Sequence, residues 1–207
     1  DDRSLELVGQ WPWSRTVLAR LTDQTYSAAA LGFDIVFAEP DRTNPQNLIS
    51  QYPDNLLLKE QLELLPDNDE VFANAIANHG TVVLGVAVNN TGDKYTNTQS
   101  KFGLVTQGDA PQQFLPAYNS MRRNISILED GASGLGSMSI GNNDAIVRSL
   151  PAFDKVNDAL LPSLGLELAR VAIGASTFQI KASNASSEQA FGEQTGINNI
   201  KLGPLTM

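Results

Sequence analysis

Two apolar segments, residues 31–38 and 81–88, constrain the fold of this 207-residue chain more than any other feature. Neither segment alternates polar with apolar side chains, which is typical of strands that are covered on both faces. Helical patterns precede the first segment and lie between the two, so helix, strand, helices and strand follow one another. This order predicts an α/β fold with a mostly parallel or mixed central sheet flanked by helices.

Capping residues indicate where the helices begin and end. Ser14 can accept a hydrogen bond from an early backbone N–H, and Asp67 can do the same three residues before Glu70, as in a capping box. Gly80 can close the helix that follows Asp67, and Pro162 suits a first helical turn, where a missing N–H costs nothing. The predicted helices cover residues 14–26, 55–65, 68–78, 120–129 and 162–173.

The second half of the chain carries weaker strand signals. Residues 89–118 are rich in Asn, Thr, Gln, Gly and Pro, and we expect a long polar loop there with a short strand at residues 102–106. Strict alternation over residues 177–183 predicts a half-exposed strand near the edge of a sheet. The remaining predicted strands are residues 200–202 and the two arms of a β-hairpin, residues 137–140 and 145–150.

Composition excludes several classes of function. The chain has 14 Lys and Arg residues against 23 Asp and Glu residues, a net charge of −9, so it would repel a phosphate backbone and we expect no nucleic-acid partner. It has no Cys, which excludes disulfides, thiolate metal ligands and a Cys nucleophile. Its longest apolar run is far shorter than the ~20 residues that a membrane-spanning helix needs.

Motifs for catalysis are weak in this chain. The single histidine, His79, lies at a predicted helix C-terminus, where a cation is favourable, and we interpret it as a helix-terminal residue. The glycine-rich residues 131–137 lack the Gly-Lys-Ser/Thr ending of a phosphate-binding loop, and residues 137–141 lack the first Gly of a nucleophile elbow. We interpret both segments as turns, and we predict no catalytic residue, no metal site and no cofactor.

Asp34 is the most unusual residue, because it stands inside the first apolar strand. A buried carboxylate costs several kcal/mol unless it is hydrogen-bonded or paired. Arg15, Arg148 or backbone N–H groups could satisfy it. Asp34 is interpreted either as an internal polar tie, which is the commoner situation, or as a ligand contact.

Further candidate residues lie near this strand in the sequence. Glu39 and Asp41 follow its C-terminal end, where ligands gather in open α/β sheets, although a solvated acidic turn is the commoner reason for such charges. Trp13, which is separated from Trp11 by a proline, is either a core plug or an aromatic stacking wall. The candidate ligand-binding residues are Asp34, Glu39, Asp41, Arg15, Trp13 and Arg148.

Several segments resemble the type-two CHASE sensory domain. Residues 9–15 (GQWPWSR) resemble that family's opening signature, and residues 32–42 (GFDIVFAEPDR) resemble its first internal strand. Residues 69–77, followed by residues 82–85, are similar to its next helix–strand unit. Residues 144–148 (DAIVR) and 161–164 (LPSL) look like a later block. The segments occur in the family's order over most of the chain.

This resemblance implies a sensory domain that performs no catalysis. Domains of this family lie outside the cytoplasmic membrane of bacteria, between membrane-spanning helices of receptors, and regulate nucleotide cyclases, kinases or similar output modules. The resemblance further implies one extracytoplasmic (periplasmic) domain over residues 1–207, a small-molecule or peptide ligand, and a homodimer in the intact receptor. The chain begins at Asp1 without Met, and we expect a fragment that lacks sheet strands at both ends and attaches to the membrane only through flanking helices.

Two other functions stay open. Asp34 with Glu39 or Asp41 could act as the acid and base of a hydrolase, assisted by Mg²⁺ or Ca²⁺. The chain could also be a free solute-binding protein. A bound divalent cation or substrate turnover would favour the hydrolase, whereas flanking hydrophobic helices of ~20 residues in the same gene would argue against the free binding protein.

Overall fold

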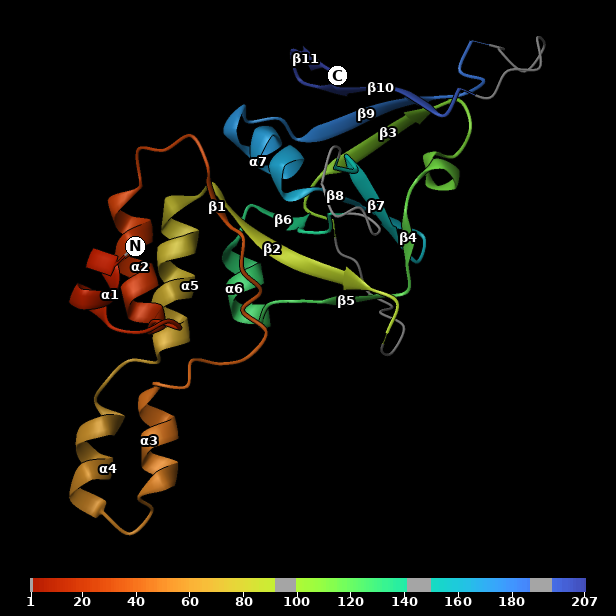
Figure 1. Ribbon diagram of the computed structural model, residues 1–207. Coiled ribbons are helices and arrows are strands. Elements are labelled where there is room, and N and C mark those ends of the chain that lie inside the picture. The colour runs from red at the N-terminus through yellow and green to blue at the C-terminus, as the bar shows by residue number, and fades with distance from the viewer. Residues whose placement is uncertain (1, 92–99, 141–149, 187–194) are drawn as a thin grey trace. The chain divides into compact units, whose positions relative to one another are not determined.

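The computed structural model describes residues 2–91, 100–140, 150–186 and 195–207 (Figure 1). The chain forms two compact units and passes between them several times. The helical unit consists of Asp1–Ala28, Phe37–Gly80 and Asn124–Ala132, and the sheet unit consists of Ala29–Val36, Thr81–Arg123 and Ser133–Met207. The single domain over residues 1–207 stays a prediction.

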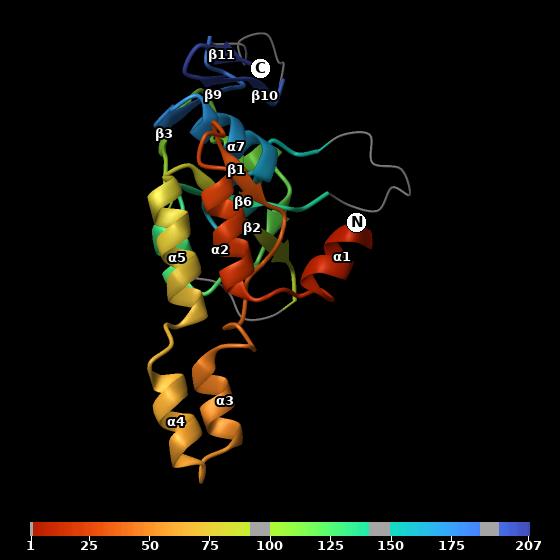
Figure 2. The same ribbon diagram turned by 90° about the vertical axis from the view of Figure 1, so that its left-hand side faces the viewer.

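The helical unit is built around the pair α2 and α5. Its helices are α1 (Asp2–Val8), α2 (Arg15–Gln24), α3 (Pro45–Gln51), α4 (Leu56–Glu63), α5 (Asn68–His79) and α6 (Ser126–Gly131). Helices α2 and α5 lie side by side in both views (Figures 1 and 2), and α6 also contacts α5. Leu18, Ile76 and Leu128 are buried on these three helices. Phe72 on α5 meets Phe37 edge to face, with 5.4 Å between the ring centroids.

The predicted caps of α2 and α5 are confirmed. The side chain of Ser14 accepts a hydrogen bond from a backbone N–H in the first turn of α2, and the side chain of Asp67 accepts two in the first turn of α5. Gly80 ends α5 in the left-handed region, with φ 75°, as a glycine readily does. The predicted helices at residues 55–65 and 68–78 correspond to α4 and α5.

Among its described residues, the sheet unit contains three sheets, the α-helix α7 and one short 3-10 helix. Its elements are β1 (Leu31–Phe33), β2 (Val82–Asn89), β3 (Gly103–Gln107), the short 3-10 helix η1 (Pro111–Phe114), β4 (Ala117–Tyr118), β5 (Ser120–Arg122), β6 (Gly134–Ser137), β7 (Phe153–Val156), β8 (Ala159–Pro162), α7 (Leu164–Ala172), β9 (Thr177–Ala182), β10 (Ile197–Leu202) and β11 (Leu205–Thr206). In the first sheet, β1 and β6 run parallel to β2, and β5 pairs antiparallel with the end of β2. The second sheet has the order β11-β10-β9-β3 and the third has the order β4-β7-β8. The predicted α/β class with a mixed sheet is confirmed.

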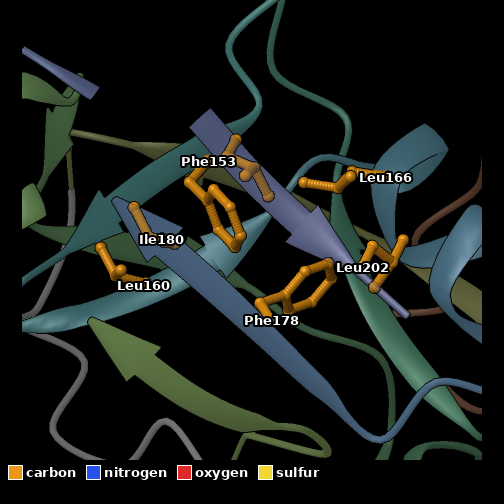
Figure 3. Close-up of a cluster of buried hydrophobic side chains, with 7 residues drawn as sticks. Phe153, Leu160, Leu166, Phe178, Ile180 and Leu202 are labelled. Atoms are coloured by element: carbon orange, nitrogen blue, oxygen red, sulfur yellow. The ribbon is translucent and has the colours of Figure 1, made fainter. Parts of the chain in front are cut away.

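The apolar core of the sheet unit joins the second and third sheets to α7 (Figure 3). Phe178 on β9 lies at its centre and meets Phe153 and Phe102 edge to face, with centroid distances of 5.1 and 5.0 Å. Burying such rings contributes strongly to stability, because aromatic side chains remove large apolar areas from water. The buried members of this core are Phe153, Leu160, Leu166, Phe178, Ile180, Ile200 and Leu202.

Glycines in β6 allow α7 to approach the first sheet closely. A Cβ atom on Gly134 would collide with the side chain of Glu167, and one on Gly136 would collide with the backbone of Leu164. The glycine-rich segment 131–137, interpreted above as a turn, therefore contains a buried strand. Its glycines serve the packing of a helix on a sheet.

The predicted strand over residues 31–38 is wrong beyond Phe33, where β1 ends. From Phe37 onward the chain belongs to the helical unit. There the N–H of Phe37 donates to Asn124 Oδ1 at 2.7 Å, and its C=O accepts from the N–H of Ile125 at 2.8 Å. One apolar segment therefore supplies side chains to two different units.

Two predicted features of the second half need correction. The helix predicted at residues 120–129 starts only at Ser126, because the preceding residues pair with the end of β2 as strand β5. Pro162 lies at the end of β8 rather than in a first helical turn, and Ser163 is the N-cap of α7. The strand predicted at residues 177–183 is confirmed as β9, which is half-exposed and lies next to the edge strand β3.

A β-hairpin is present in the second half, but it is formed by β7 and β8. Its turn contains Asn157 at φ 53°, a conformation that Asn tolerates better than most residues. The loop of the predicted hairpin and almost all of its second arm, residues 141–149, lie outside the described residues. The short strands predicted at residues 102–106 and 200–202 correspond to β3 and β10.

Candidate functional site

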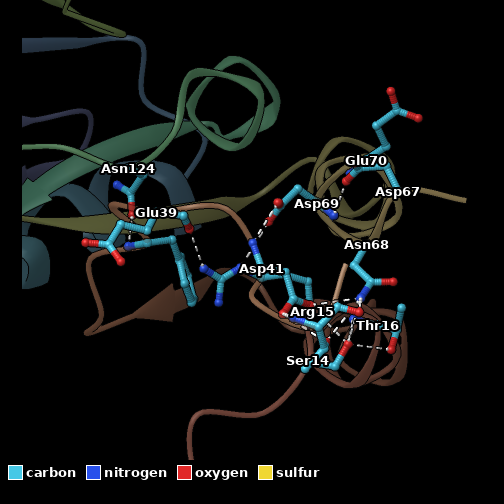
Figure 4. Close-up of polar contacts among 12 residues, drawn as sticks. Ser14, Arg15, Thr16, Glu39, Asp41, Asp67, Asn68, Asp69, Glu70 and Asn124 are labelled. Carbon is cyan, nitrogen blue, oxygen red and sulfur yellow. Dashed lines mark hydrogen bonds and ion pairs between the residues drawn. The ribbon is translucent and has the colours of Figure 1, made fainter. Parts of the chain in front are cut away.

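Asp41 is the centre of a buried polar network in the helical unit (Figure 4). The residue is only 4% exposed. Its Oδ2 accepts from the backbone N–H of Arg15 at 2.8 Å, and from Ser14 Oγ and Asn68 Nδ2, each at 3.1 Å. Its Oδ1 accepts from both the N–H and the hydroxyl of Thr43 at 2.9 Å. One carboxylate therefore ties the N-terminal ends of α2 and α5 to the segment before α3.

Arg15 provides the positive charge of this network. Its Nε lies 3.3 Å from Asp69 Oδ1, and its Nη2 donates to the backbone carbonyl of Glu39 at 3.1 Å. The guanidinium lies 4.4 Å from the ring centroid of Phe37, a cation–π arrangement. The other oxygen of Asp69 accepts from the N–H of Asp41 at 2.8 Å.

The two acids of the network differ in their pKa values. Burial raises the pKa of Asp69, although the N–H of Asp41 and the charge of Arg15 oppose this effect. Burial also acts to raise the pKa of Asp41, but the hydrogen bonds from Arg15, Thr43 and Asn68 outweigh it and lower the pKa below its ordinary value. The hydrogen bonds to Asp41 therefore favour its ionised form.

The structure brings together only part of the predicted ligand site. Arg15 was expected as a partner of Asp34, but it pairs with Asp69, and its backbone N–H donates to Asp41. Glu39 contributes its backbone carbonyl and has an exposed position. Trp13 is half-buried and donates from Nε1 to the carbonyl of Gly9 at 2.8 Å. Arg148 lies outside the described residues.

The expectation that Asp34 is buried is wrong. The residue follows the end of β1 and is exposed, in the part of the chain that belongs to the sheet unit. Because β1 stops at Phe33, the apolar side chains that follow do not enclose Asp34 as a continued strand would. An exposed carboxylate needs no internal partner, so its interpretation as a polar tie fails, and its role in ligand binding stays a prediction.

The sequence analysis missed a buried ion pair in the sheet unit. Glu167 on α7 is fully buried, and its two oxygens accept from Arg170 Nη2 at 2.6 Å and Nε at 2.8 Å. Arg170 also donates to the carbonyls of Ser133 and Ala175. Burial raises the pKa of Glu167, and the pairing with Arg170 opposes this effect. A Glu and an Arg three residues apart, each beside apolar residues of one helix, were the available signal.

Asp154 on β7 is a second buried acid that the sequence analysis missed. It is 1% exposed, and its Oδ2 accepts from Ser137 Oγ at 2.5 Å. Its Oδ1 is buried and has no hydrogen-bond partner. Burial raises the pKa of Asp154, and the bond from Ser137 opposes this effect only in part. The sequence places Asp154 between Phe153 and Lys155, and this local pattern does not indicate burial.

A small hollow in the sheet unit lies among β5, β6, β8 and the segment before β3. It encloses about 30 Å³, which is the room that roughly one water molecule occupies. Most of its lining is apolar, including Phe102 and Met121, but Lys101 and Arg123 add two cationic side chains. Two of these residues, Lys101 and Phe102, come from the polar segment 89–118.

The charged clusters that the structure describes form structural contacts within the protein. The carboxylates of Asp41, Asp69 and Glu167 accept bonds from backbone N–H groups, polar side chains or Arg side chains and are buried. A general base has to come within hydrogen-bond distance of a proton on its substrate. These carboxylates are buried and already bonded, so a substrate does not reach them. Among the residues that the structure describes, no group of three or more His, Asp or Glu side chains could hold a metal ion.

The fold is of mixed α/β class, and the buried charges of these clusters hold chain segments in place. The family model of the CHASE2 domain matches residues 1–204, so the chain belongs to the CHASE2 domain family. CHASE2 domains are extracellular sensory domains of membrane signalling receptors and are not catalytic. No curated protein and no solved structure matches the chain. In the described ranges, no helix has both the length and the apolar character to span a membrane.

Proposed function

We propose that this chain is the ligand-sensing input domain of a bacterial transmembrane receptor. It lies on the periplasmic side of the membrane and regulates a cytoplasmic output module, such as a nucleotide cyclase or a histidine kinase. In the intact receptor it acts as a homodimer, and the ligand favours one of two arrangements by an amount set by its differential affinity. The family match over residues 1–204 carries this proposal.

Reporter fusions to the intact receptor test the placement of the domain. Alkaline phosphatase inserted into the exposed α3–α4 connection should be active, because that enzyme matures only outside the cytoplasm, and a fluorescent protein that matures only in the cytoplasm should stay dark there. The gene should also encode flanking apolar segments of about 20 residues. Alkaline phosphatase that stays inactive while the fluorescent protein lights up contradicts the proposal. A gene without these apolar segments favours the free solute-binding protein.

The hollow of the sheet unit is the proposed ligand site. We prefer the hollow to the network around Asp41 as a ligand site, because the oxygens of Asp41 already accept five hydrogen bonds from the protein. The cationic Lys101 and Arg123 beside apolar walls favour a small anion with an apolar part, such as a carboxylate. Because the hollow is small, a ligand has to displace side chains, and the flexible Met121 is suited to such movement.

Thermal unfolding of the chain with panels of small carboxylates, amines and sugars tests this site. A binding carboxylate should raise the melting temperature, because a ligand that binds only the folded state stabilises it. The Lys101→Gln variant should lose that rise, and Lys201→Gln, an exposed lysine on β10, should keep it. Stabilisation by amines alone, or an equal rise in both variants, overturns the proposed site.

The hydrolase alternative receives no support from the geometry. It paired Asp34 with Glu39 or Asp41, but Asp41 is buried and saturated with donors while Asp34 is exposed. Hydrolysis of ester, phosphoester or glycoside substrates by the purified chain with Mg²⁺ or Ca²⁺, lost in Asp34→Asn, would restore it.

A further inference from the structure

Strand β3 is an open edge of the second sheet. It is the last strand in the order β11-β10-β9-β3, and no other described strand pairs with its far side (Figure 1). All five of its residues, Gly103–Gln107, are exposed, Leu104 by 39% and Val105 by 50%. The unpaired N–H and C=O groups of such an edge are a template for a further strand. Strand β3 can therefore be extended by a strand from another chain.

The opposite edge of this sheet is protected, whereas β3 is not. Strand β11 has only two residues, Leu205–Thr206, and directly follows Pro204. Short edge strands, proline and charged side chains are common means by which proteins prevent the addition of strands. Strand β3 has five residues, with the sequence GLVTQ, and contains neither proline nor a charge. This difference favours β3 as the edge at which the sheet is extended.

The backbone groups that face the open edge are those of Leu104 and Thr106. On the inner side, the N–H of Gly103 donates to the carbonyl of Ser176, which directly precedes β9, at 2.8 Å. Successive residues of a strand direct their backbone groups to opposite sides, so Val105 also faces β9. Leu104 and Thr106 therefore direct their N–H and C=O groups away from β9.

We propose that β3 pairs antiparallel with β3 of a second copy of this chain, about a two-fold axis at Val105. In this register Leu104 lies opposite Thr106 of the second copy, and the two residues exchange backbone hydrogen bonds on both sides of the axis. The two copies of the sheet then form one continuous sheet. The contact gives an interface to the homodimer proposed above, and its role in signalling rests on that proposed function.

Opposite charges at the two ends of β3 select this register. Lys101 is four residues before Val105, and Asp109 is four residues after it. A two-fold axis at Val105 brings Lys101 of one copy to the end of the contact where Asp109 of the other copy lies, and it does so twice. Opposite charges across paired strands are favourable. Registers with the axis at Leu104 or Thr106 lose this match.

The net charge of the chain does not oppose the contact at this edge. The described strands β3, β9, β10 and β11 contain Lys181 and Lys201 and no Asp or Glu. In the proposed dimer three strand spacings, about 14 Å, separate the two β9 strands. That separation exceeds the Debye length at physiological ionic strength, so repulsion between the lysines of the two copies is screened.

Single-cysteine variants test the contact and its register, because the chain has no Cys. With the axis at Val105, the Cα atoms of the two Val105 residues lie about 4.5 Å apart, which is within the range of a disulfide. Val105→Cys should therefore form a disulfide-linked dimer when oxygen in air oxidises the purified protein. Leu205→Cys is the matched control: Leu205 is 45% exposed on β11, at the opposite edge, and should stay largely unlinked.

Sedimentation equilibrium from about 1 to about 200 μM measures the contact without a cross-link. Thr106→Pro removes an N–H at the open edge while leaving the pairing with β9, and should weaken dimerisation by at least about tenfold. Thr206→Pro is the matched control. The N–H and C=O of Met207 bond Ile200, so the neighbouring Thr206 faces away from β10, and the same substitution there should leave dimerisation unchanged. Both variants keep Lys101, which also lines the proposed ligand site.

Three results would overturn the proposal. The first is a chain that stays monomeric over the whole concentration range. The second is cross-linking of Leu205→Cys as fast as that of Val105→Cys. The third is a folded Thr106→Pro variant that dimerises as tightly as the original chain or as Thr206→Pro. Circular dichroism checks folding, and if Thr106→Pro does not fold, the cross-linking result decides. Alkaline phosphatase that stays inactive in the receptor fusion contradicts the receptor function without affecting these results.

Discussion

Asp41 Oδ2 lies 2.8 Å from the backbone nitrogen of Arg15, so a carboxylate in the segment before α3 holds the first turn of α2. Anions near a helix N-terminus are favourable, because the backbone N–H groups there have no partner within the helix. The same carboxylate binds Asn68 in the first turn of α5. A single acid thus fixes the starts of the two helices that form the centre of the helical unit.

Replacing Asp41 by Ala should lower the free energy of unfolding by about 2–5 kcal/mol, because the change leaves several buried donors without an acceptor. Urea denaturation followed by circular dichroism measures it. The control is Asp34→Ala, which removes an exposed carboxylate and should change stability by less than about 0.5 kcal/mol. Equal effects of the two substitutions would contradict the structural role assigned to Asp41.

The buried ion pair on α7 should show strong coupling. Arg170→Met leaves Glu167 buried without its cation and should cost about 3–5 kcal/mol. The double variant Glu167→Leu/Arg170→Met should recover much of this loss, because both charges are removed together. Urea denaturation of the two single variants and the double variant gives the coupling energy.

An exposed ion pair supplies the control for this measurement. Lys59 and Glu63 lie 3.7 Å apart on α4 and are each about half-exposed. Glu63→Gln should cost under about 0.5 kcal/mol, because solvent and salt screen such pairs. A double variant on α7 that is no more stable than Arg170→Met would show that the pair is not the source of the loss.

Asp154→Asn should change how stability depends on pH. Burial raises the pKa of Asp154, so the folded state keeps a proton that the unfolded state releases. The contribution of Asp154 to the free energy of unfolding therefore decreases as pH rises above about 4. Asn does not titrate, so the stability of the variant relative to the original chain should increase from pH 3 to pH 7. Denaturant titrations at several pH values measure this difference. A difference that stays constant, or decreases with pH, would contradict the assignment.

Gly134→Ala should destabilise the sheet unit by about 1–3 kcal/mol, because the added methyl group forces α7 away from β6. Gly165→Ala is the control, since Gly165 lies on α7 itself and an added Cβ there meets nothing within 4 Å. That substitution should be neutral or stabilising, as Ala favours helix over Gly. Thermal unfolding compares the two variants, and similar losses in both would contradict the close packing at Gly134.

Local signals identified those parts of this chain whose conformation depends on a few neighbouring residues. The caps at Ser14, Asp67 and Gly80 and the apolar strand β2 were recognised, because hydrogen bonds within one helical turn and unbroken apolar runs are visible in the sequence. The caps and apolar runs led to the α/β class, whereas the CHASE2 family was indicated by the resemblance of its motifs.

Tertiary contacts alone decided which acids are buried and where the first strand ends. Phe37 is held by Asn124, a residue 87 positions away, and this bond takes the apolar segment out of β1. Asp34 is exposed and Asp41 is buried because the chain leaves the sheet unit for the helical unit between them. The burial of Asp154 follows from the packing of β7. No local pattern contains this information, because the environment of a carboxylate is set by whichever distant segments fold around it.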